Sequence, residues 1–353
     1  MHKERLDYID ALRGFTMILV VFAHVETFIL SIEVHETFLG SLFQSFRMPL
    51  FFFISGFLSY KIDKSWDLVI WKHYIFRRIR FQIIPTLICG AIYTYCLLKV
   101  NIVDFISDYY KLGYWFTICL FGMLFILHTT NLVLYKFSIS KKKYVIFILF
   151  TITCLLYILR CVFERSPEFA RLSNVFCFHQ ISLYFPFFIL GYISSLCRTT
   201  FYKFMDNNII QSIVLVSFCF LFYFKVTSYS SLCQVSNFLM LLYRKIQVLI
   251  IPLFGIFIVF NLFRKKHIYF TKDTYIVKKL KYIGKHTLEI YLLHYFFLSP
   301  IPKIGSFILK YPNLILELFI GLSVSLLVIV ACMVISNLVK TNPILGRCLL
   351  GSK

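Results

Sequence analysis

Long apolar stretches separated by short polar segments run along the whole chain. A helix needs roughly 20 residues, at a rise of about 1.5 Å each, to cross the hydrocarbon core of a bilayer. The pattern therefore predicts an all-α, polytopic membrane bundle of about ten transmembrane helices. In chain order the predicted spans are 12–32, 39–60, 82–100, 114–134, 144–162, 181–197, 209–226, 246–263, 288–308 and 314–339.

The polar connections are too short for a separate soluble domain. The longest, 59–81 and 264–287, hold about twenty residues each and could not bury a core. The first apolar segment lacks a small-residue cleavage site and contains Arg13 and His24, so we expect it to remain as a helix. The sequence thus predicts one membrane-embedded domain over residues 1–353.

Composition agrees with this pattern and leaves the charge to be explained. Hydrophobic residues make up 59% of the 353 residues and charged residues 15%, against about a quarter charged in soluble domains. A net charge of +21, from 37 Lys+Arg and 16 Asp+Glu, would suggest nucleic acid as partner of a soluble protein. In a membrane protein the cytoplasmic loops collect Lys and Arg instead.

Placing both termini in the cytoplasm puts most basic residues on the inner side. The exception is the connection between the seventh and eighth spans, where Lys225, Arg244 and Lys245 fall outside. We therefore expect a multi-pass protein of the inner membrane, with the lipid bilayer and not nucleic acid as its partner.

The eleven cysteines give no sign of a metal site. No CxxC or Cys/His spacing typical of metal ligands occurs, and most cysteines fall within spans as small apolar fillers. We expect no metal. Cys161 and Cys177 share one predicted outer loop and could pair, an alternative that the sequence leaves open.

Ionisable side chains inside a span are costly, so they mark the places to search for function. The first span carries Asp10, Arg13 and His24. At 100° per residue the eleven-residue spacing puts Arg13 and His24 on one face about 16 Å apart, with Asp10 one turn below Arg13. The alternatives are a snorkelling anchor for Arg13 and a packing role for His24.

The second span contains Arg47 and the pair Ser55-Gly56. Arg47 requires a polar partner at that depth, and Glu26 on the outer part of the first helix is a candidate. The small pair favours close approach by another helix.

Three arginines stand together ahead of the third predicted span. On a helix Arg77 and Arg80 share a face, while Arg78 points elsewhere. Guanidinium groups at the inner surface bind phosphates, either of lipid headgroups or of a phosphorylated cofactor.

The ninth span brings Glu289, Tyr291 and His294 together. Tyr291 and His294 are one turn apart and face the same way. We expect Glu289 to be held by Lys285, four residues earlier.

The order of these motifs resembles the acyltransferase 3 family of bacterial integral-membrane acyltransferases. The resemblance covers nearly the whole chain, and the arginine and histidine of the first span are its most specific part. The segments that carry it are Asp10…Leu12-Arg13-Gly14…His24, Met48-Pro49-Leu50-Phe51-Phe52-Phe53…Ser55-Gly56-Phe57, Arg77–Arg80 before Pro85, Trp115-Phe116, Phe187–Tyr192 and Leu288–His294.

This resemblance implies a ten-helix enzyme that moves an acyl group, most often acetyl, from cytoplasmic acyl-CoA to a hydroxyl of a surface polysaccharide or lipid-linked glycan. By matching position, Arg13 and His24 form the essential pair, and Arg77, Arg78 and Arg80 form the basic motif. Arg13 and this motif would bind the phosphates of acyl-CoA. His24 would act as general base or accept the acyl group itself, with Asp10 orienting its partners.

Two positions depart from the family pattern. Arg47 stands where many relatives have a histidine before Met-Pro, and Phe81 stands where many have a second basic residue. The remaining polar positions are expected to bind substrate: Tyr291, His294, Glu289, Arg47 and Ser55.

Two other classes of function compete with the enzyme. A transporter or flippase would line its pathway with the same His and Arg residues, but the sequence shows no repeated halves and no matching pair of broken helices. A structural scaffold would leave the buried polar stripe without a purpose. The sequence leaves the oligomeric state, the acyl group and the acceptor open.

Overall fold

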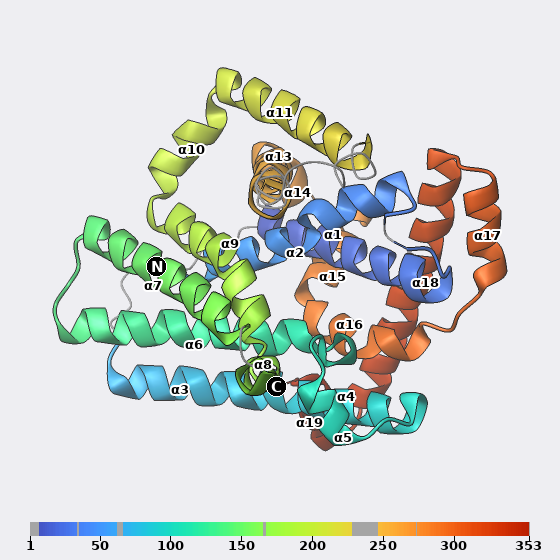
Figure 1. Ribbon diagram of the computed structural model, residues 1–353, viewed down its shortest axis with the longest axis horizontal. Helices are drawn as coiled ribbons and strands as arrows, with labels where there is room; N and C mark the ends of the chain where they lie inside the picture. The colour runs from blue at the N-terminus through green and yellow to red at the C-terminus, as the bar shows by residue number, and fades with distance from the viewer. Residues whose placement is uncertain are drawn as a thin grey trace. The chain divides into compact units, whose positions relative to one another are not determined.

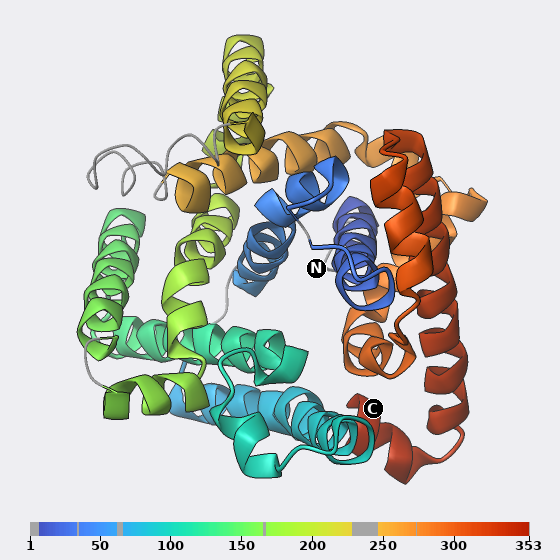
Figure 2. The same ribbon diagram turned by 45° about the vertical axis from the view of Figure 1, so that its right-hand side comes forward.

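A computed structural model describes residues 7–33, 35–61, 66–164, 167–227, 246–272 and 274–352. Helices make up the fold, and no strand occurs in this described part of the chain (Figure 1; Figure 2). The α-helices are α1 (Asp7–His24), α2 (Phe38–Ser59), α3 (Leu68–Arg78), α4 (Ile84–Ile92), α5 (Ile102–Ser107), α6 (Trp115–Lys136), α7 (Lys142–Phe163), α8 (Pro167–Val175), α9 (Phe178–Leu196), α10 (Arg198–Asp206), α11 (Asn208–Thr227), α13 (Ile251–Lys265), α14 (His267–Thr271), α15 (Tyr275–Lys285), α16 (Thr287–Leu293), α17 (Pro302–Lys310), α18 (Leu314–Lys340) and α19 (Pro343–Leu350).

Short π- and 3-10 segments join several of these helices. They are η1 (Val25–Ile29), η2 (Ile79–Ile83), η3 (Tyr93–Leu98), η4 (Lys111–Gly113), η6 (Ile246–Ile250) and η7 (His294–Phe297). The π-type segments η1, η2 and η3 continue α-helices without a break, so the first and third spans change their winding partway along.

The predicted helical membrane bundle is confirmed. Within the described residues, eight helices are long and apolar enough to cross a membrane, and two bent pairs bring the number to ten if each is one span. These ten segments follow the ten predicted spans in order. The chain is a multi-pass membrane protein. Two of the basic residues predicted to lie in the outer connection between the seventh and eighth spans, Arg244 and Lys245, lie outside the described residues.

Three spans differ from the prediction in shape. The third is a helical stretch from Leu68 to Leu98, so it begins well before the predicted start at residue 82 and includes the three arginines. Glu168–Val175 and Phe178–Leu196 meet at 55°, and Thr287–Phe297 and Pro302–Lys310 at 96°. The second bend follows from Pro300 and Pro302, which cannot continue a helix. Broken helices, which the sequence did not indicate, therefore do occur.

The described residues fall into two compact units that alternate along the chain. Unit 1 takes those of Met1–Ile54, Cys197–Thr287 and Phe297–Ala331, and unit 2 those of Ser55–Leu196, Leu288–Phe296 and Cys332–Lys353.

In unit 1 the helices α1 and α15 cross with their backbones in contact. A Cβ atom built on Gly14 would lie 2.0 Å from the carbonyl oxygen of Leu280, and one on Gly284 would lie 1.8 Å from that of Asp10. Only glycine fits both positions. Small residues at a helix crossing in a membrane allow this approach, and here they fix α15 beside the first turns of α1.

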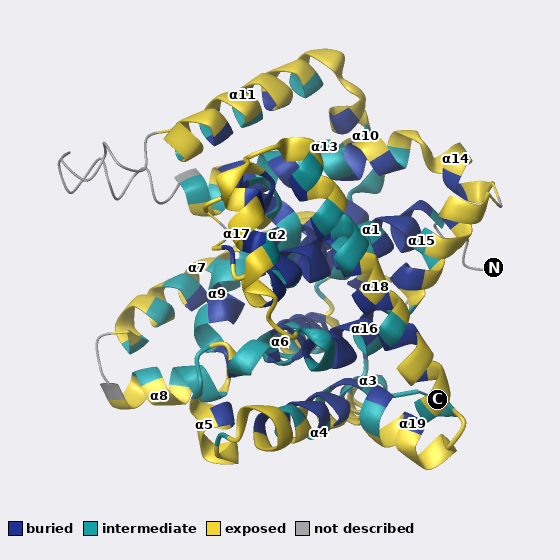
Figure 3. Ribbon diagram, turned by 90° about the vertical axis from the view of Figure 1, so that its right-hand side faces the viewer, coloured by how far each residue is buried: buried dark blue, intermediate teal, exposed yellow. Residues whose placement is uncertain are grey.

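Burial separates the inner helices of unit 1 from its outer ones. Most of α1 is buried, whereas α11 is exposed along most of its length (Figure 3). Because α11 is also strongly apolar, its exposed side chains are those of a helix that faces lipid.

Unit 2 contains a second close helix crossing, between α2 and α9. A Cβ atom on Gly56 would lie 1.8 Å from the carbonyl oxygen of Phe188. The predicted close approach at Ser55-Gly56 is therefore confirmed.

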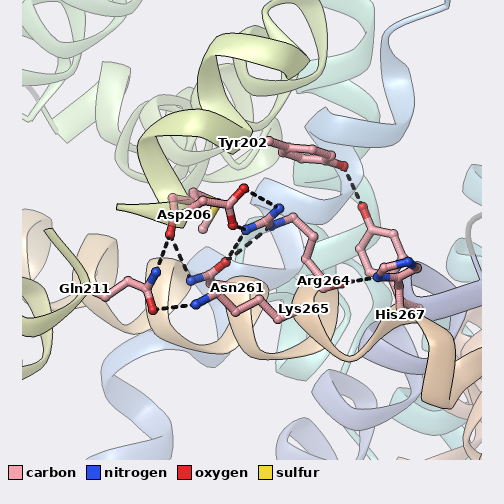
Figure 4. Close-up of polar contacts among 9 residues, drawn as sticks. Tyr202, Asp206, Gln211, Asn261, Arg264, Lys265 and His267 are labelled. Atoms are coloured by element: carbon pink, nitrogen blue, oxygen red, sulfur yellow. Dashed lines mark hydrogen bonds and ion pairs between the residues drawn. The ribbon is translucent and has the colours of Figure 1, made fainter. Parts of the chain in front are cut away.

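A polar cluster joins α10 to α13 in unit 1 (Figure 4). Both terminal nitrogens of Arg264 donate to the carboxylate of Asp206, its Nε and Nη2 donate to Asn261 Oδ1 at 3.2 and 2.7 Å, and its guanidinium lies 4.7 Å from the ring centre of Tyr202. The hydrogen bond from Arg264 holds the pKa of Asp206, which lies outside the spans, below its ordinary value. Tyr202 also shares a hydrogen bond of 2.8 Å with Tyr8, so the cluster reaches α1.

We expect Gly284→Ala to destabilise the protein by about 1–3 kcal/mol, because its methyl group would meet backbone that cannot move aside. Gly122→Ala is the matched control, since a methyl there meets only the flexible end of the Ile181 side chain. Thermal unfolding in detergent compares the two variants. Equal melting temperatures would contradict the account of the crossing.

We expect Asp206→Asn to lower the melting temperature at neutral pH. The folded-state pKa of Asp206 is depressed, so its stabilising effect is present above the ordinary aspartate pKa of about 3.9 and is lost as the pH falls through the depressed value. The difference between wild type and variant should therefore shrink in acid. A pH-independent difference, or one matched by the exposed control Asp104→Asn, would refute this expectation.

Candidate active site

Arg13 is fixed in unit 1 by two side chains. Its Nη2 donates to Thr287 Oγ1 at 2.8 Å, and its Nη1 lies 4.0 Å from Asp10 Oδ1. Thr287 is buried at the start of α16 and follows the glycine crossing by three residues. The predicted proximity of Asp10 to Arg13 is confirmed, while Thr287 is a partner that the sequence did not indicate.

His24 is the last residue of α1 and is half-buried. Because α1 is unbroken from Asp7 to His24, the spacing of about 16 Å along the helix axis to Arg13 holds. The His24 ring lies edge-on to Phe28, with ring centres 6.0 Å apart, and the helix changes to π winding directly after it. Such changes in winding are frequent at functional sites.

A buried group of charged residues lies around Glu26 in unit 1. Arg47 and Glu317 both lie within electrostatic range of Glu26, and the proximity of Arg47 was expected. Thr37 Oγ1 donates to Glu26 at 3.2 Å, and the backbone N–H of Leu39 donates to Glu317 at 3.1 Å. The group therefore combines two buried carboxyl groups with a nearby arginine.

Lys225 adds a second basic residue to this group. Its Nζ donates to Ser45 Oγ at 2.9 Å, and the charge of Arg47 acts on it. The sequence did not single out Glu317, and it marked Lys225 only as an exception in the distribution of basic residues. Each stands near the end of a predicted span, where a charged residue is ordinary.

In unit 2 the three arginines have different surroundings. Arg77 and Arg80 are exposed, whereas Arg78 is half-buried, which agrees with the prediction that Arg78 points elsewhere. Arg78 donates from Nε and Nη2 to the Tyr74 hydroxyl at 3.2 and 2.9 Å and from Nη1 to Gln82 Oε1 at 3.3 Å. Tyr74 and Gln82 were not singled out in the sequence. Their spacing of four residues on either side of Arg78 was the available signal.

Tyr291 and His294 lie together, with ring centres 5.9 Å apart, as predicted. The Tyr291 hydroxyl donates to the carbonyl oxygen of Gly113 at 2.8 Å and accepts from the Phe116 N–H at 3.1 Å. His294 is fully buried, and its Nδ1 lies 2.8 Å from the Tyr291 carbonyl oxygen. Tyr291 thus fixes the start of α6, and any contact of its hydroxyl with substrate would compete with these bonds.

Glu289 has partners other than Lys285, and that prediction is wrong. Its carboxylate accepts from Lys340 Nζ at 2.6 Å and from the Ser336 hydroxyl, both on α18. The spacing argument fails because α15 ends at Lys285 and a new helix begins at Thr287. Ser55, the remaining predicted substrate contact, is half-buried on α2 in unit 2.

The described residues contain no group of three or more His, Cys, Asp and Glu side chains that could hold a metal ion. Cys161 is exposed and Cys177 is buried, and both thiols are free in the structure. The residues predicted to bind phosphate groups are Arg13, which lies in unit 1, and Arg77, Arg78 and Arg80, which lie in unit 2.

The fold and these buried charges define a multi-pass helical membrane protein with a polar site inside its spans. The family model described as an acyltransferase domain matches residues 6–335. The chain therefore belongs to the acyltransferase 3 family and is a membrane acyltransferase. No curated protein and no solved structure matches the chain.

We expect Glu289→Gln and Lys340→Met each to lower stability, because each leaves a half-buried charge without its partner. The double variant should be less destabilised than the sum of the two, with a coupling energy of about 1–3 kcal/mol. The control pair is Arg160 and Glu164, whose carboxylate is half exposed and whose coupling should be about 0.3–0.5 kcal/mol. Additive losses at Glu289 and Lys340 in thermal unfolding would show that the pair does not stabilise unit 2.

Proposed function

We propose that this acyltransferase moves an acyl group, most often acetyl, from cytoplasmic acyl-CoA to a hydroxyl of a surface polysaccharide or lipid-linked glycan. The observation that carries the proposal is the pair on α1, where Arg13 and His24 share an unbroken helix and Arg13 is fixed by Thr287 and Asp10. Membership of the acyltransferase family supports acyl transfer as the reaction.

Arg13 is the proposed contact for a phosphate of the donor. Guanidinium groups bind phosphate oxygens through parallel, charge-assisted hydrogen bonds, and an arginine already held in place loses less entropy on binding. Thr287 holds the guanidinium through one terminal nitrogen. Arg77, Arg78 and Arg80 of unit 2 are proposed as further phosphate contacts.

His24 is the proposed reactive base. The pantetheine arm of CoA is long enough for the spacing of about 16 Å between Arg13 and His24. In direct transfer, His24 takes the proton of the acceptor hydroxyl while the oxygen attacks the thioester carbon. A C–O bond forms, the C–S bond breaks, and the proton passes to the leaving thiolate. In the covalent route, a ring nitrogen of His24 attacks the thioester carbon, the C–S bond breaks, and the ring N–H proton passes to the leaving thiolate. The acceptor hydroxyl then attacks the acyl carbon, the C–N bond breaks, and the hydroxyl proton returns to the imidazole.

The acceptor is proposed to meet polar groups beyond His24. Arg47 with the carboxyl groups of Glu26 and Glu317 offers charged hydrogen-bonding groups suited to hydroxyls. The substrate contacts proposed in unit 2 are Ser55, Glu289, Tyr291 and His294. Asp10 is proposed to orient Arg13. Since basic residues gather on the predicted inner side, we place the protein in the inner membrane with both termini cytoplasmic.

A transporter or flippase is the second candidate, favoured by the two bent helix pairs. Discontinuous helices often form the substrate sites of transporters. Binding of CoA distinguishes the two candidates, because a transporter for a glycan or lipid intermediate has no need of it.

We expect acetyl-CoA to raise the melting temperature of the detergent-solubilised wild type, since a ligand that binds only the folded state stabilises it by about 2.7 kcal/mol at 100 times its Kd. His24→Ala should keep this stabilisation but lower transfer of labelled acetyl in membranes by roughly 10²–10⁴-fold. Arg13→Gln should lose the stabilisation. The control His35→Ala, at an exposed histidine, should leave both measurements unchanged.

If His24→Ala transferred acetyl at the wild-type rate, His24 would have no part in the reaction. No stabilisation by acetyl-CoA at millimolar concentration would overturn the donor assignment and favour the transporter.

A further inference from the structure

Arg78 differs from the other two arginines in how it is held. Three of its five N–H groups are engaged, two by the Tyr74 hydroxyl and one by the Gln82 carbonyl oxygen. Both partners are neutral, so the positive charge is fixed in place without being neutralised. Among the residues that the structure describes, two N–H groups remain, one on each terminal nitrogen. Each of the two can donate a charge-assisted hydrogen bond to a phosphate oxygen.

Gln82 is itself anchored deeper in unit 2. Its side chain is buried, and its Nε2 donates to the carbonyl oxygen of Thr117 at 2.7 Å. Thr86 Oγ1 donates to the backbone carbonyl of Gln82 at 2.7 Å and contacts Thr117 Oγ1 at 2.9 Å. These bonds tie the π-segment η2 to α6, so the position of the Gln82 amide is set by rigid elements on both sides.

The chemistry of this position requires an amide. The –NH₂ end must face the Thr117 carbonyl, which only accepts, and the carbonyl end must face Arg78, which only donates. A carboxylate would oppose the Thr117 carbonyl and neutralise the Arg78 charge. A leucine of similar size would fill the space and hold neither group.

We propose that Gln82, assisted by Tyr74, is a positioning residue that orients the Arg78 guanidinium toward a phosphate of the acyl-CoA donor. This inference rests on the proposed function, since it takes acyl-CoA as the ligand. It assigns to Arg78, among the three arginines, the contact whose direction is fixed. The exposed Arg77 and Arg80 make no comparable side-chain hydrogen bond within the part of the chain that the structure describes. Arg80 instead lies over the Phe81 ring, 5.6 Å from its centre.

The test measures the Kd of purified protein for CoA and acetyl-CoA, the KM and kcat for acetyl-CoA, and the melting temperature. Gln82→Leu should raise the Kd and KM roughly 10-fold or more with kcat little changed, because ground-state donor binding is weakened. Gln82→Glu should weaken binding at least as much, since it adds a negative charge beside Arg78. Tyr74→Phe removes a single hydroxyl and should raise the Kd without altering the fold.

Gln180→Leu is the matched control. Gln180 is also buried in unit 2, and its Nε2 also donates to a backbone carbonyl, that of Tyr109, at 2.7 Å. It contacts no arginine in the described hydrogen bonds. Its loss should lower the melting temperature as Gln82→Leu does, but leave the Kd for CoA at the wild-type value.

Wild-type Kd values in both Gln82→Leu and Tyr74→Phe would overturn the inference and leave Gln82 a packing residue. If Gln82→Leu does not fold, Tyr74→Phe alone decides. Failure of the wild type itself to bind CoA would overturn the proposed function, and this inference with it.

Discussion

The backbone contact between α1 and α15 is the constraint on which the proposed donor site of unit 1 depends. Gly14 and Gly284 leave no room for a Cβ atom, so the two helices meet at a single fixed position. Thr287 follows Gly284 by three residues and therefore lies where its hydroxyl meets Arg13 at 2.8 Å. Two glycines thus set the position of Arg13, the residue that is proposed to bind the donor.

In unit 2, side-chain hydrogen bonds position the arginine that is proposed to bind the donor. In a medium with little water a buried polar group must find its partner within the protein, and each partner then acts as a positional constraint. Gln82 is held by Thr117 and in turn holds Arg78, while Tyr291 holds the start of α6. A cation held by neutral groups keeps its charge for a ligand. Fixed positive charge of this kind is what binding of an anionic donor requires.

The sequence predicted the helical class and the order of the spans well, because hydrophobic length is a direct consequence of bilayer thickness. It also placed Arg13, Asp10 and His24 correctly on one helix, since a local period of 3.6 residues decides that. It failed where chain breaks and distant contacts decide. Because the helix breaks after Lys285, Glu289 pairs with Lys340 on α18 and not with Lys285. Thr287, which holds Arg13, is 274 residues away from it in the sequence. No local spacing encodes such contacts.

The affinity of the Gly284→Ala variant for CoA, set against that of Gly122→Ala, tests this account most directly. If the α1–α15 contact positions Arg13 for the donor, the Gly284 variant that remains folded should bind CoA roughly 10-fold or more weakly, because small displacements of a binding group are costly. Gly122→Ala should bind as wild type does. A Gly284→Ala protein with a lowered melting temperature but wild-type affinity for CoA would contradict the account.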